Sequence, residues 1–205
     1  MKLPTLRGSI VQLEPLSRAH LIRLESVAFD PAIWRYMLVS VANRAELESW
    51  VDNALSISPD RQITWVTTLR SSESNDRNES KDRIVGSTRL IDIDPHHRTA
   101  EIGHTWINPA FHGTGVNAEA KLLQLTYAFE ELELNRVAFK THHENLHSQA
   151  AIRKLGAVYE GTFRNHYIMP DGSPRHSIWF SITRDEWPQV RSRLMERLQA
   201  APPSV

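Results

Sequence analysis

The sequence predicts a mixed α/β fold, in which helices flank a central, mostly antiparallel and twisted sheet of about seven strands. Strand-like segments rich in β-branched residues, such as 63–69 and 84–93, share the chain with helical segments such as 116–132, where apolar residues recur every three or four positions. Such mixing indicates a sheet covered by helices. The chain has 205 residues, of which 40% are hydrophobic, and this is enough for one buried core.

The order of the elements follows from alternation, helical spacing and turn residues. Residues 9–14 alternate apolar and polar side chains, and Ser17 can cap the helix that follows. Pro170-Asp171-Gly172 is a strong turn signal between the last two strands. We expect strands at 9–14, 63–69, 84–93, 99–107, 136–141, 158–168 and 177–183, and helices at 17–28, 45–55, 116–132, 148–155 and 185–198.

The chain is expected to form a single domain over residues 1–205. Residues 71–83 contain no large apolar side chain, and we interpret them as a solvated hairpin loop because strand-like sequence continues on both sides. The helix at 185–198 would close the domain, and residues 201–205 would be a flexible tail.

Charge balance and missing residue types exclude several classes of function. Lys and Arg number 24, as do Asp and Glu, and a net charge of zero argues against broad nucleic-acid binding. The absence of Cys excludes a disulfide, a thiolate zinc site and a cysteine nucleophile. No apolar run approaches the ~20 residues that span a bilayer, and the N-terminal stretch does not resemble a signal peptide. We therefore expect a cytoplasmic protein with no nucleic-acid or membrane partner.

Residues 106–121, WINPAFHGTGVNAEAK, are the most informative segment. A strand is expected to end here, a loop with Gly113 and Gly115 follows, and a helix begins. Free N–H groups at a helix N-terminus suit a phosphate, and glycine lets the backbone approach it closely. A simple helix-opening turn explains the loop equally well. It is not a P-loop, because Gly-Lys-Ser/Thr is missing, and it lacks the third glycine of a dinucleotide fingerprint.

A second segment, residues 145–157 (NLHSQAAIRKLGA), favours the phosphate-binding interpretation over the simple helix-opening turn. Together the two segments resemble the GNAT superfamily of N-acetyltransferases, and the wider run is most similar to its ribosomal-protein N-terminal acetyltransferase (Rim-type) branch. Ile84-Val-Gly-Ser87 and Ala100-Glu-Ile-Gly103 support the resemblance. It covers about residues 7–183, which would form the core of the domain, and it implies a sheet splayed at its middle strands.

The resemblance implies an enzyme that moves an acetyl group from acetyl-CoA to a primary amine by direct attack in a ternary complex, without a metal. The acceptor would be a small molecule or a protein N-terminus, and lysine side chains, polyamines, amino acids and aminoglycosides all stay open. A homodimer is one candidate assembly, since many relatives pair. The alternative is a non-catalytic acyl-CoA-binding regulatory module with the same fold. Its basis is twofold: Ile152 replaces the Tyr of many relatives, and the usual Gln/Arg and last Gly/Ala of the loop are His112 and Asn117 here.

The resemblance also assigns binding residues. The glycine loop would bind the pyrophosphate, the segment at Asn145 would line the pantetheine arm, and N–H donors near Trp106 would hold the thioester oxygen. The expected cofactor-binding residues are Trp106, Ile107, His112, Gly113, Thr114, Gly115, Val116, Asn117, Asn145 and Ser148.

The catalytic residues are expected to be Glu101 and Ser148. The amine must lose a proton to attack, and Glu101 matches a position where some relatives hold their base, although a structural Glu is the competing interpretation. His104 is the rival base, and its three-residue spacing would place it on the opposite face of the strand. The Tyr that protonates the thiolate in many relatives is Ile152 here, so Ser148 or an ordered water would take that role.

Clustered histidines raise the alternative of a metal site. His143 and His147 are four apart, which is a helical ligand spacing, and His142 is adjacent. Asn145 is expected to open a helix between them, so the two would not share one helical face. We therefore expect no metal and interpret the cluster as exposed loop residues.

Overall fold

The computed structural model describes residues 3–70 and 83–200. A single sheet with strand order β1-β2-β3-β4-β5-β6-β8-β7 lies at its centre. Only β5 and β6 run parallel to each other among these neighbours. The strands are β1 (Leu6–Arg7), β2 (Val11–Pro15), β3 (Ile63–Leu69), β4 (Ile84–Asp94), β5 (Thr99–Ile107), β6 (Arg136–His142), β7 (Val158–Ile168) and β8 (Pro174–Thr183).

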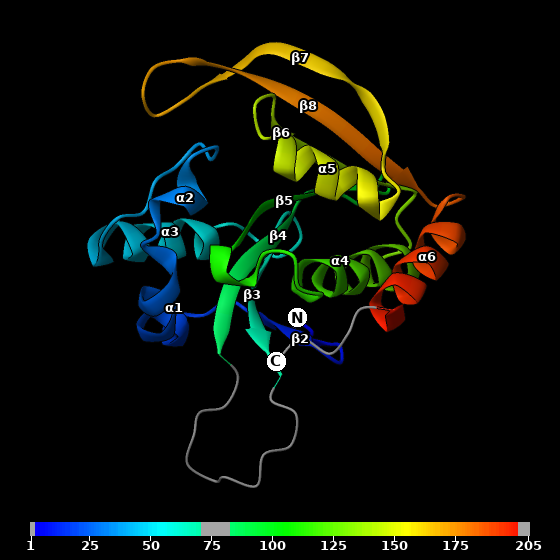
Figure 1. Ribbon diagram of the computed structural model, residues 1–205, viewed down its shortest axis with the longest axis horizontal. Helices are drawn as coiled ribbons and strands as arrows, with labels where there is room; N and C mark the ends of the chain where they lie inside the picture. Colours follow the sequence, from blue (N-terminus) through cyan, green and yellow to red (C-terminus); the bar gives the residue numbers. More distant parts are fainter. Residues whose placement is uncertain (1–2, 71–82, 201–205) are drawn as a thin grey trace, which may run out of the picture.

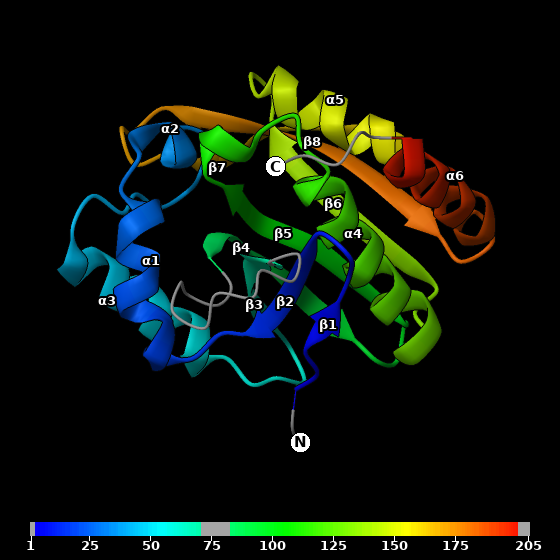
Figure 2. The same ribbon diagram turned by 60° about the horizontal axis from the view of Figure 1, so that its bottom comes forward.

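Helices cover both faces of the sheet (Figures 1 and 2). Buried side chains of α1, α2 and α3 form one core with the sheet, and those of α4, α5 and α6 form the other. No helix in the described ranges is both long and apolar enough to span a membrane. The helices are η1 (Arg18–His20), α1 (Leu21–Ala28), α2 (Pro31–Trp34), α3 (Arg44–Ser56), η2 (Pro109–Phe111), α4 (Val116–Thr126), the π-helical turn η3 (Tyr127–Glu131), α5 (Leu146–Leu155) and α6 (Trp187–Ala200).

The predicted mixed α/β fold is confirmed, with one strand more than the expected seven. The extra strand, β1, has two residues, too few to show alternation in a sequence. Pro15, which predicts a break, is instead the last residue of β2 and pairs with Trp65, because a missing N–H is tolerated at a strand end. The sequence prediction lacks α2, which forms because Asp30 accepts a hydrogen bond from the Ala32 N–H and Pro31 opens the helix.

Other boundaries shift without changing the order of elements. The helix predicted at 116–132 is α-helical only as far as Thr126 and continues as η3. The predicted tail at 201–205 and most of the predicted loop at 71–83 lie outside the described residues.

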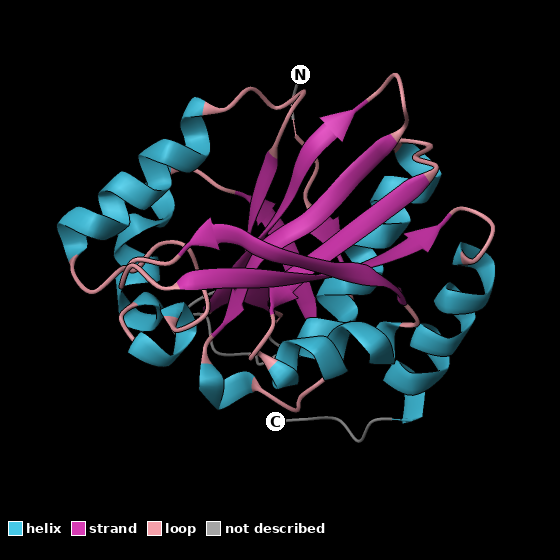
Figure 3. Cartoon of the chain, turned by 90° about the horizontal axis from the view of Figure 1, so that it is seen from above, coloured by secondary structure: helices cyan, strands magenta, loops and turns pink. Residues whose placement is uncertain are grey.

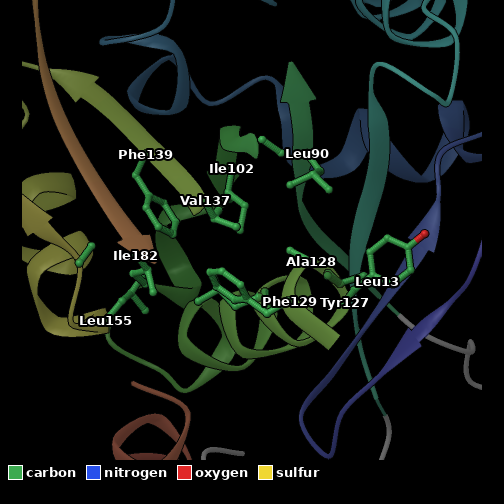
Figure 4. Close-up of a cluster of buried hydrophobic side chains, with 14 of the residues drawn as sticks. Leu13, Leu90, Ile102, Tyr127, Ala128, Phe129, Val137, Phe139, Leu155 and Ile182 are labelled. Carbon is green, nitrogen blue, oxygen red and sulfur yellow. The ribbon is translucent and has the colours of Figure 1, made fainter. Parts of the chain in front are cut away.

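The larger core lies between the sheet and the helices α4 to α6 (Figure 4). Side chains from the strands, such as Leu13 and Ile102, point toward those of η3, such as Phe129. Leu13 is fully buried, and Ile102 and Phe129 are almost so. This packing fixes α4 against the sheet.

Glu119 ties the first turns of α4 to the start of β2. Its carboxylate accepts hydrogen bonds from the backbone N–H groups of Ser9 (2.9 Å), Ile10 (2.7 Å) and Val11 (2.6 Å). A Cβ atom on Gly8 would lie 2.3 Å from the carboxylate carbon, so this turn requires glycine. The clamp holds the N-terminal end of α4 in a fixed place relative to the sheet.

The two parallel strands separate in the middle of the sheet. Their pairing ends at Ile102 and Phe139, whereas β5 continues to Ile107 and β6 to His142. The predicted splay of the middle strands is therefore confirmed. Figure 3 shows the sheet from above with helices on both sides, and in Figure 1 the β7–β8 hairpin extends across the top from the side of α6 to the side of α2.

Candidate active site

A cleft of about 570 Å³ opens where β5 and β6 separate. Along its β5 side, the edge that faces β6 has no strand partner beyond Ile102 within the described sheet. Beyond Ile102, the backbone groups on this edge have no strand hydrogen bonds to β6, so those without a side-chain partner can bind a ligand. The cleft is lined by β5 from Ile102 to Ile107, by Phe139, Lys140 and Thr141 of β6, by the loop before α4, by α5, by residues 32–37 except Trp34, and by Arg175 and Arg197.

The glycine loop predicted to bind phosphate lies at this cleft, but its two glycines have different environments. Gly113 lines the cleft with a φ of +79°, which favours glycine, and a Cβ atom there would meet open space. Gly115 does not line the cleft, and its Cβ atom would lie 2.5 Å from Cδ1 of Ile10. Val116 is buried in the core. Gly115 and Val116 can therefore contribute only backbone N–H groups to a ligand.

The remaining loop residues surround the N-terminus of α4. Thr114 and Asn117 line the cleft. His112 lies where the family pattern has Gln or Arg, and its Nε2 atom is 3.0 Å from the Ile107 carbonyl oxygen. Its ring also stacks on His147 of α5, with ring centroids 5.1 Å apart. His112 therefore connects the loop to the end of β5 and to α5.

The start of α5 forms the wall opposite β5. The Asn145 side chain accepts a hydrogen bond from the Ser148 N–H at 3.0 Å and so caps the helix. Both residues line the cleft, and their contact with the pantetheine arm stays a prediction. The Ser148 hydroxyl has no hydrogen-bond partner in the described part of the chain, so it is free to contact a ligand.

The sequence prediction does not include two cationic residues of the cleft. Lys154 of α5 and Arg197 of α6 line the cleft. Leu198 reaches to 3.6 Å from the Cβ position of Gly115, which places the end of α6 beside the loop. These residues come from separate helices, so no local spacing could reveal them.

A bulge distorts β5 in the middle of the cleft. Arg89 pairs with Gly103 and Ser87 with Trp106, so two residues of β5, His104 and Thr105, oppose one residue of β4. His104 has a φ of +47°, a strained value for a non-glycine residue. The regular alternation that would place His104 opposite Glu101 therefore ends at Gly103.

Glu101 is 4% exposed and lies just behind the cleft wall. Its Oε2 atom is 3.1 Å from Nζ of Lys140, which lines the cleft. Burial raises the pKa of Glu101, and the positive charge of Lys140 partly opposes this rise. A Cβ atom on Gly103 would lie 2.9 Å from Glu101 Oε1, so the Ala-Glu-Ile-Gly motif leaves room for the carboxylate. A carboxyl whose pKa is raised in this way holds a proton more tightly than an exposed carboxylate, which suits it to accept one.

His104 lines the cleft as a neutral imidazole. Burial, followed by the positive charges of Arg89, Lys140 and Arg175, lowers its pKa to about 4. Lys140 and Arg175 also influence the pKa of Glu101, so both candidate bases lie near the same cations. At neutral pH the His104 ring has a lone pair but is a weak base.

Lys121 is a buried amine that the sequence prediction lacks. It lines the cleft from α4, and Nζ donates hydrogen bonds to Thr88 (2.9 Å), Thr105 (2.6 Å) and Gln124 (2.9 Å). Burial lowers its pKa to about 7. Lys121 therefore connects α4 to β4 and to the bulge of β5. Lys121 is four residues from Leu125 on the same helix, so the sequence pattern indicates a core position and not a functional amine.

The side chain of Trp106 points away from the side of the cleft where the cofactor is expected. The indole packs with Trp34 (ring centroids 5.7 Å apart) and Trp50 (6.2 Å) in the core below α1 to α3. The backbone of Trp106 and Ile107 runs along the cleft.

The histidines form a stack and not a ligand set. His142 stacks on His143 (4.4 Å between centroids), which is 4.6 Å from His176. Within residues 3–70 and 83–200, no group of three or more His, Asp or Glu side chains has the arrangement of a metal site. His147 lies apart from this stack, against His112.

Known proteins share this fold and its motifs. The family model "Acetyltransferase (GNAT) domain" matches residues 11–158. YdaF of Bacillus subtilis (strain 168), assigned as a ribosomal N-acetyltransferase, is 36% identical over 104 residues, which are 51% of this chain and 56% of YdaF. The chain spans about half the length of the curated relatives it matches.

Solved structures agree over nearly the whole chain. A GCN5-related N-acetyltransferase from Brucella melitensis has a TM-score of 0.84 at 28% identity, over 97% of this chain and 86% of that one. RimJ of Mycobacterium smegmatis has a TM-score of 0.75 at 21% identity, over 95% and 93%, which shows the shared fold. The resemblance drawn from the segments at Gly113 and Asn145 is confirmed, and the chain belongs to the GNAT acetyltransferase family.

Proposed function

We propose that this protein is an N-acetyltransferase that moves an acetyl group from acetyl-CoA to a primary amine by direct attack in a ternary complex. The observation that carries the proposal is the cleft at the separation of β5 and β6. It brings together an unpaired strand edge and the N-terminus of α4, and the candidate base Glu101 lies behind its wall in contact with the cleft residue Lys140. The family membership of the chain supports the same activity.

The residues around the α4 loop fit acetyl-CoA. Backbone N–H groups of the first turn, from Gly115 to Asn117, would bind the pyrophosphate, and Lys154 and Arg197 would add positive charge. Asn145 and Ser148 would line the pantetheine arm. The related M. smegmatis RimJ structure is a complex with CoA-disulfide, which supports a CoA site in this fold.

The chemistry needs a base, an oxyanion donor and a route for the leaving group. The neutral amine nitrogen would attack the thioester carbon, and Glu101 would take the proton directly or through one water. Backbone N–H groups near Trp106 and Ile107 would stabilise the developing charge on the carbonyl oxygen. The C–S bond then breaks, and Ser148 or a water would protonate the CoA thiolate.

The non-catalytic alternative predicts binding of acetyl-CoA without turnover. Its main support is Ile152, which lies where many relatives have a catalytic Tyr. The substitution at His112 supports it less, because the Nε2 contact with the Ile107 carbonyl oxygen still holds the loop. A homodimer and a cytoplasmic location stay predictions.

Two measurements test the proposal. Titration calorimetry with a chelator present should show acetyl-CoA binding at micromolar affinity or better. Free CoA should then appear when amines are added. Binding without CoA release over a broad amine panel would favour the regulatory module, and no binding at millimolar cofactor would exclude both.

A further inference from the structure

Arg175 places a poorly partnered positive charge at the end of the cleft near Tyr36, which we call the acceptor end. It reaches the cleft from β8 with a side chain that is 6% exposed. Nη1 donates to the Tyr36 carbonyl oxygen at 3.3 Å, but Nε has no hydrogen-bond partner within the described structure. No carboxylate of the described residues lies within 4.0 Å of this guanidinium.

Arg89 supplies a second buried guanidinium nearby. It is 3% exposed and lies over the ring of Trp50, 4.9 Å from the ring centroid. In the ranges that the structure describes, it makes no hydrogen bond and no ion pair. Its charge lowers the pKa of His104, a residue of the cleft wall, so its field reaches the cleft.

The charges around the acceptor end do not balance. Lys140 has Glu101 as its partner at 3.1 Å, and the charge of Glu101 also acts on Arg175, but among the described residues no carboxylate lies within 4.0 Å of Arg89 or Arg175. A buried charge without a counter-charge is costly, and a bound ligand can supply the missing one. The planar fork of Arg matches a carboxylate or a phosphate group.

The unpaired charge lies away from the proposed phosphate site. Arg175 contacts Tyr36, next to α2, whereas Arg197 lies on α6 next to Leu198, which is beside the loop. In Figure 1, the hairpin that carries Arg175 reaches the side of α2. A negative charge bound by Arg175 therefore belongs to the acceptor and not to the pyrophosphate.

We propose that the acceptor is a small amine that also carries an anionic group, of the carboxylate or phosphate class, and that Arg175 binds this group. The proposal rests on the acetyltransferase function proposed above. Arg89 favours the same ligands through its charge. Amines that carry only positive charge, such as polyamines and aminoglycosides, are disfavoured at this end. Amino acids fit the proposal best, since amine and carboxylate are close together.

The test compares acceptors that differ only in charge. Amino acids, the matching amino acid amides, ethanolamine phosphate, ethanolamine and spermidine are each offered with acetyl-CoA to the full chain, and CoA release is followed. The wild type should use an anionic amine with a kcat/KM roughly 10- to 100-fold above its neutral counterpart, the size expected of a charged hydrogen bond. Amino acids and ethanolamine phosphate distinguish a carboxylate from a phosphate.

Variants of Arg175 link the preference to this residue. Arg175→Met should remove the preference by raising KM for the anionic amine roughly 10- to 100-fold, while the neutral amine is little affected. Arg175→Lys should restore part of it. Arg191→Met is the control, since this exposed residue of α6 pairs with Glu130 outside the cleft. Acetyl-CoA binding by each variant shows that it is folded.

A binding readout separates this inference from the proposed activity. Anionic amines should raise the melting temperature in the presence of CoA, and Arg175→Met should abolish that rise. If this holds without CoA release, the anion site at Arg175 stands as a ligand site, whereas the acetyltransferase proposal and the acceptor role of the ligand fail. The inference is overturned, and the activity kept, if amides or spermidine are used as well as amino acids. It is also overturned if Arg175→Met affects both members of a pair equally, or if anionic amines neither bind nor react.

Discussion

Nζ of Lys140 and Oε2 of Glu101 lie 3.1 Å apart, with Glu101 almost fully buried behind the cleft wall. Burial favours the neutral carboxyl, and the lysine ammonium favours the carboxylate. Burial is the larger of the two effects, so the pKa of Glu101 is raised overall, and a general base gains proton affinity in this way.

Replacing Glu101 by Gln should remove the base but keep the shape of the site. General base catalysis contributes about 10²–10⁴-fold, so kcat should fall by that order while acetyl-CoA affinity changes little. The loss should shrink as the pH rises, because more free amine is present. Glu160→Gln is the control, since Glu160 is exposed on β7 and does not line the cleft. An unchanged kcat and pH profile for Glu101→Gln would leave Glu101 with a structural role only.

Replacing Lys140 by Met should move the pH profile. Without the neighbouring cation, the pKa of Glu101 should rise further above its ordinary value, since Lys140 lowers it. The acid limb of kcat against pH should therefore move to higher pH, with activity largely recovered above that limb. The measurement is kcat from pH 5 to 9 for both proteins. A limb at the wild-type position would show that another group titrates there.

His104 should make the fold sensitive to acid. Its pKa is lowered from 6.5 to about 4 by burial and by three cations, so between these values the unfolded chain binds more protons than the folded one. The free energy of unfolding should fall as the pH drops from 6.5 to 4, by roughly 3 kcal/mol at most. His104→Asn should reduce this slope, whereas His97→Asn, in an exposed turn, is the control. Denaturant unfolding at pH 4, 5, 6 and 7 gives the slopes.

Local patterns predicted the fold well because each helix and strand has its own hydrophobic periodicity and its own capping or turn residues. Asn145 caps α5 and Gly156 ends it in a left-handed conformation, as their residue types suggest. The failures come from tertiary contacts. β1 exists because Leu6 and Arg7 pair with β2, and nothing in a two-residue segment predicts that partner.

The site was predictable where one segment carries it and hidden where several elements meet. Gly113 and Ser148 line the cleft from motifs that are continuous in the chain. Arg175 and Lys140 come from strands far apart in the sequence, and their significance depends on tertiary contacts: Lys140 pairs with Glu101, whereas Nε of Arg175 has no hydrogen-bond partner in the described structure. The bulge at His104 could also not be predicted from the apolar–polar alternation of β5, because a bulge is defined by the pairing with the neighbouring strand β4.

Gly115 offers the last test, because the structure gives it a second reason to be glycine. Its φ of −66° suits any residue, so Gly115→Ala introduces no backbone strain, but the new Cβ would lie 2.5 Å from Ile10 Cδ1. Ile10 is half-buried and Cδ1 is the end of its side chain, so this side chain can turn aside, and we expect a loss of only about 1 kcal/mol in the free energy of unfolding. Ile10→Ala opens this space, so the double variant should be more stable than the sum of the single effects by about 0.5 kcal/mol or more. Gly113→Ala is the contrast: its φ of +79° strains alanine, and no neighbour that could be trimmed lies within 4 Å.

Denaturant unfolding of the single and double variants measures the coupling, and calorimetry measures acetyl-CoA binding by each. One result would contradict this packing role. If the two stability effects are additive, and if Gly115→Ala loses acetyl-CoA binding both alone and combined with Ile10→Ala, the glycine serves the phosphate and not the packing of α4 on β2.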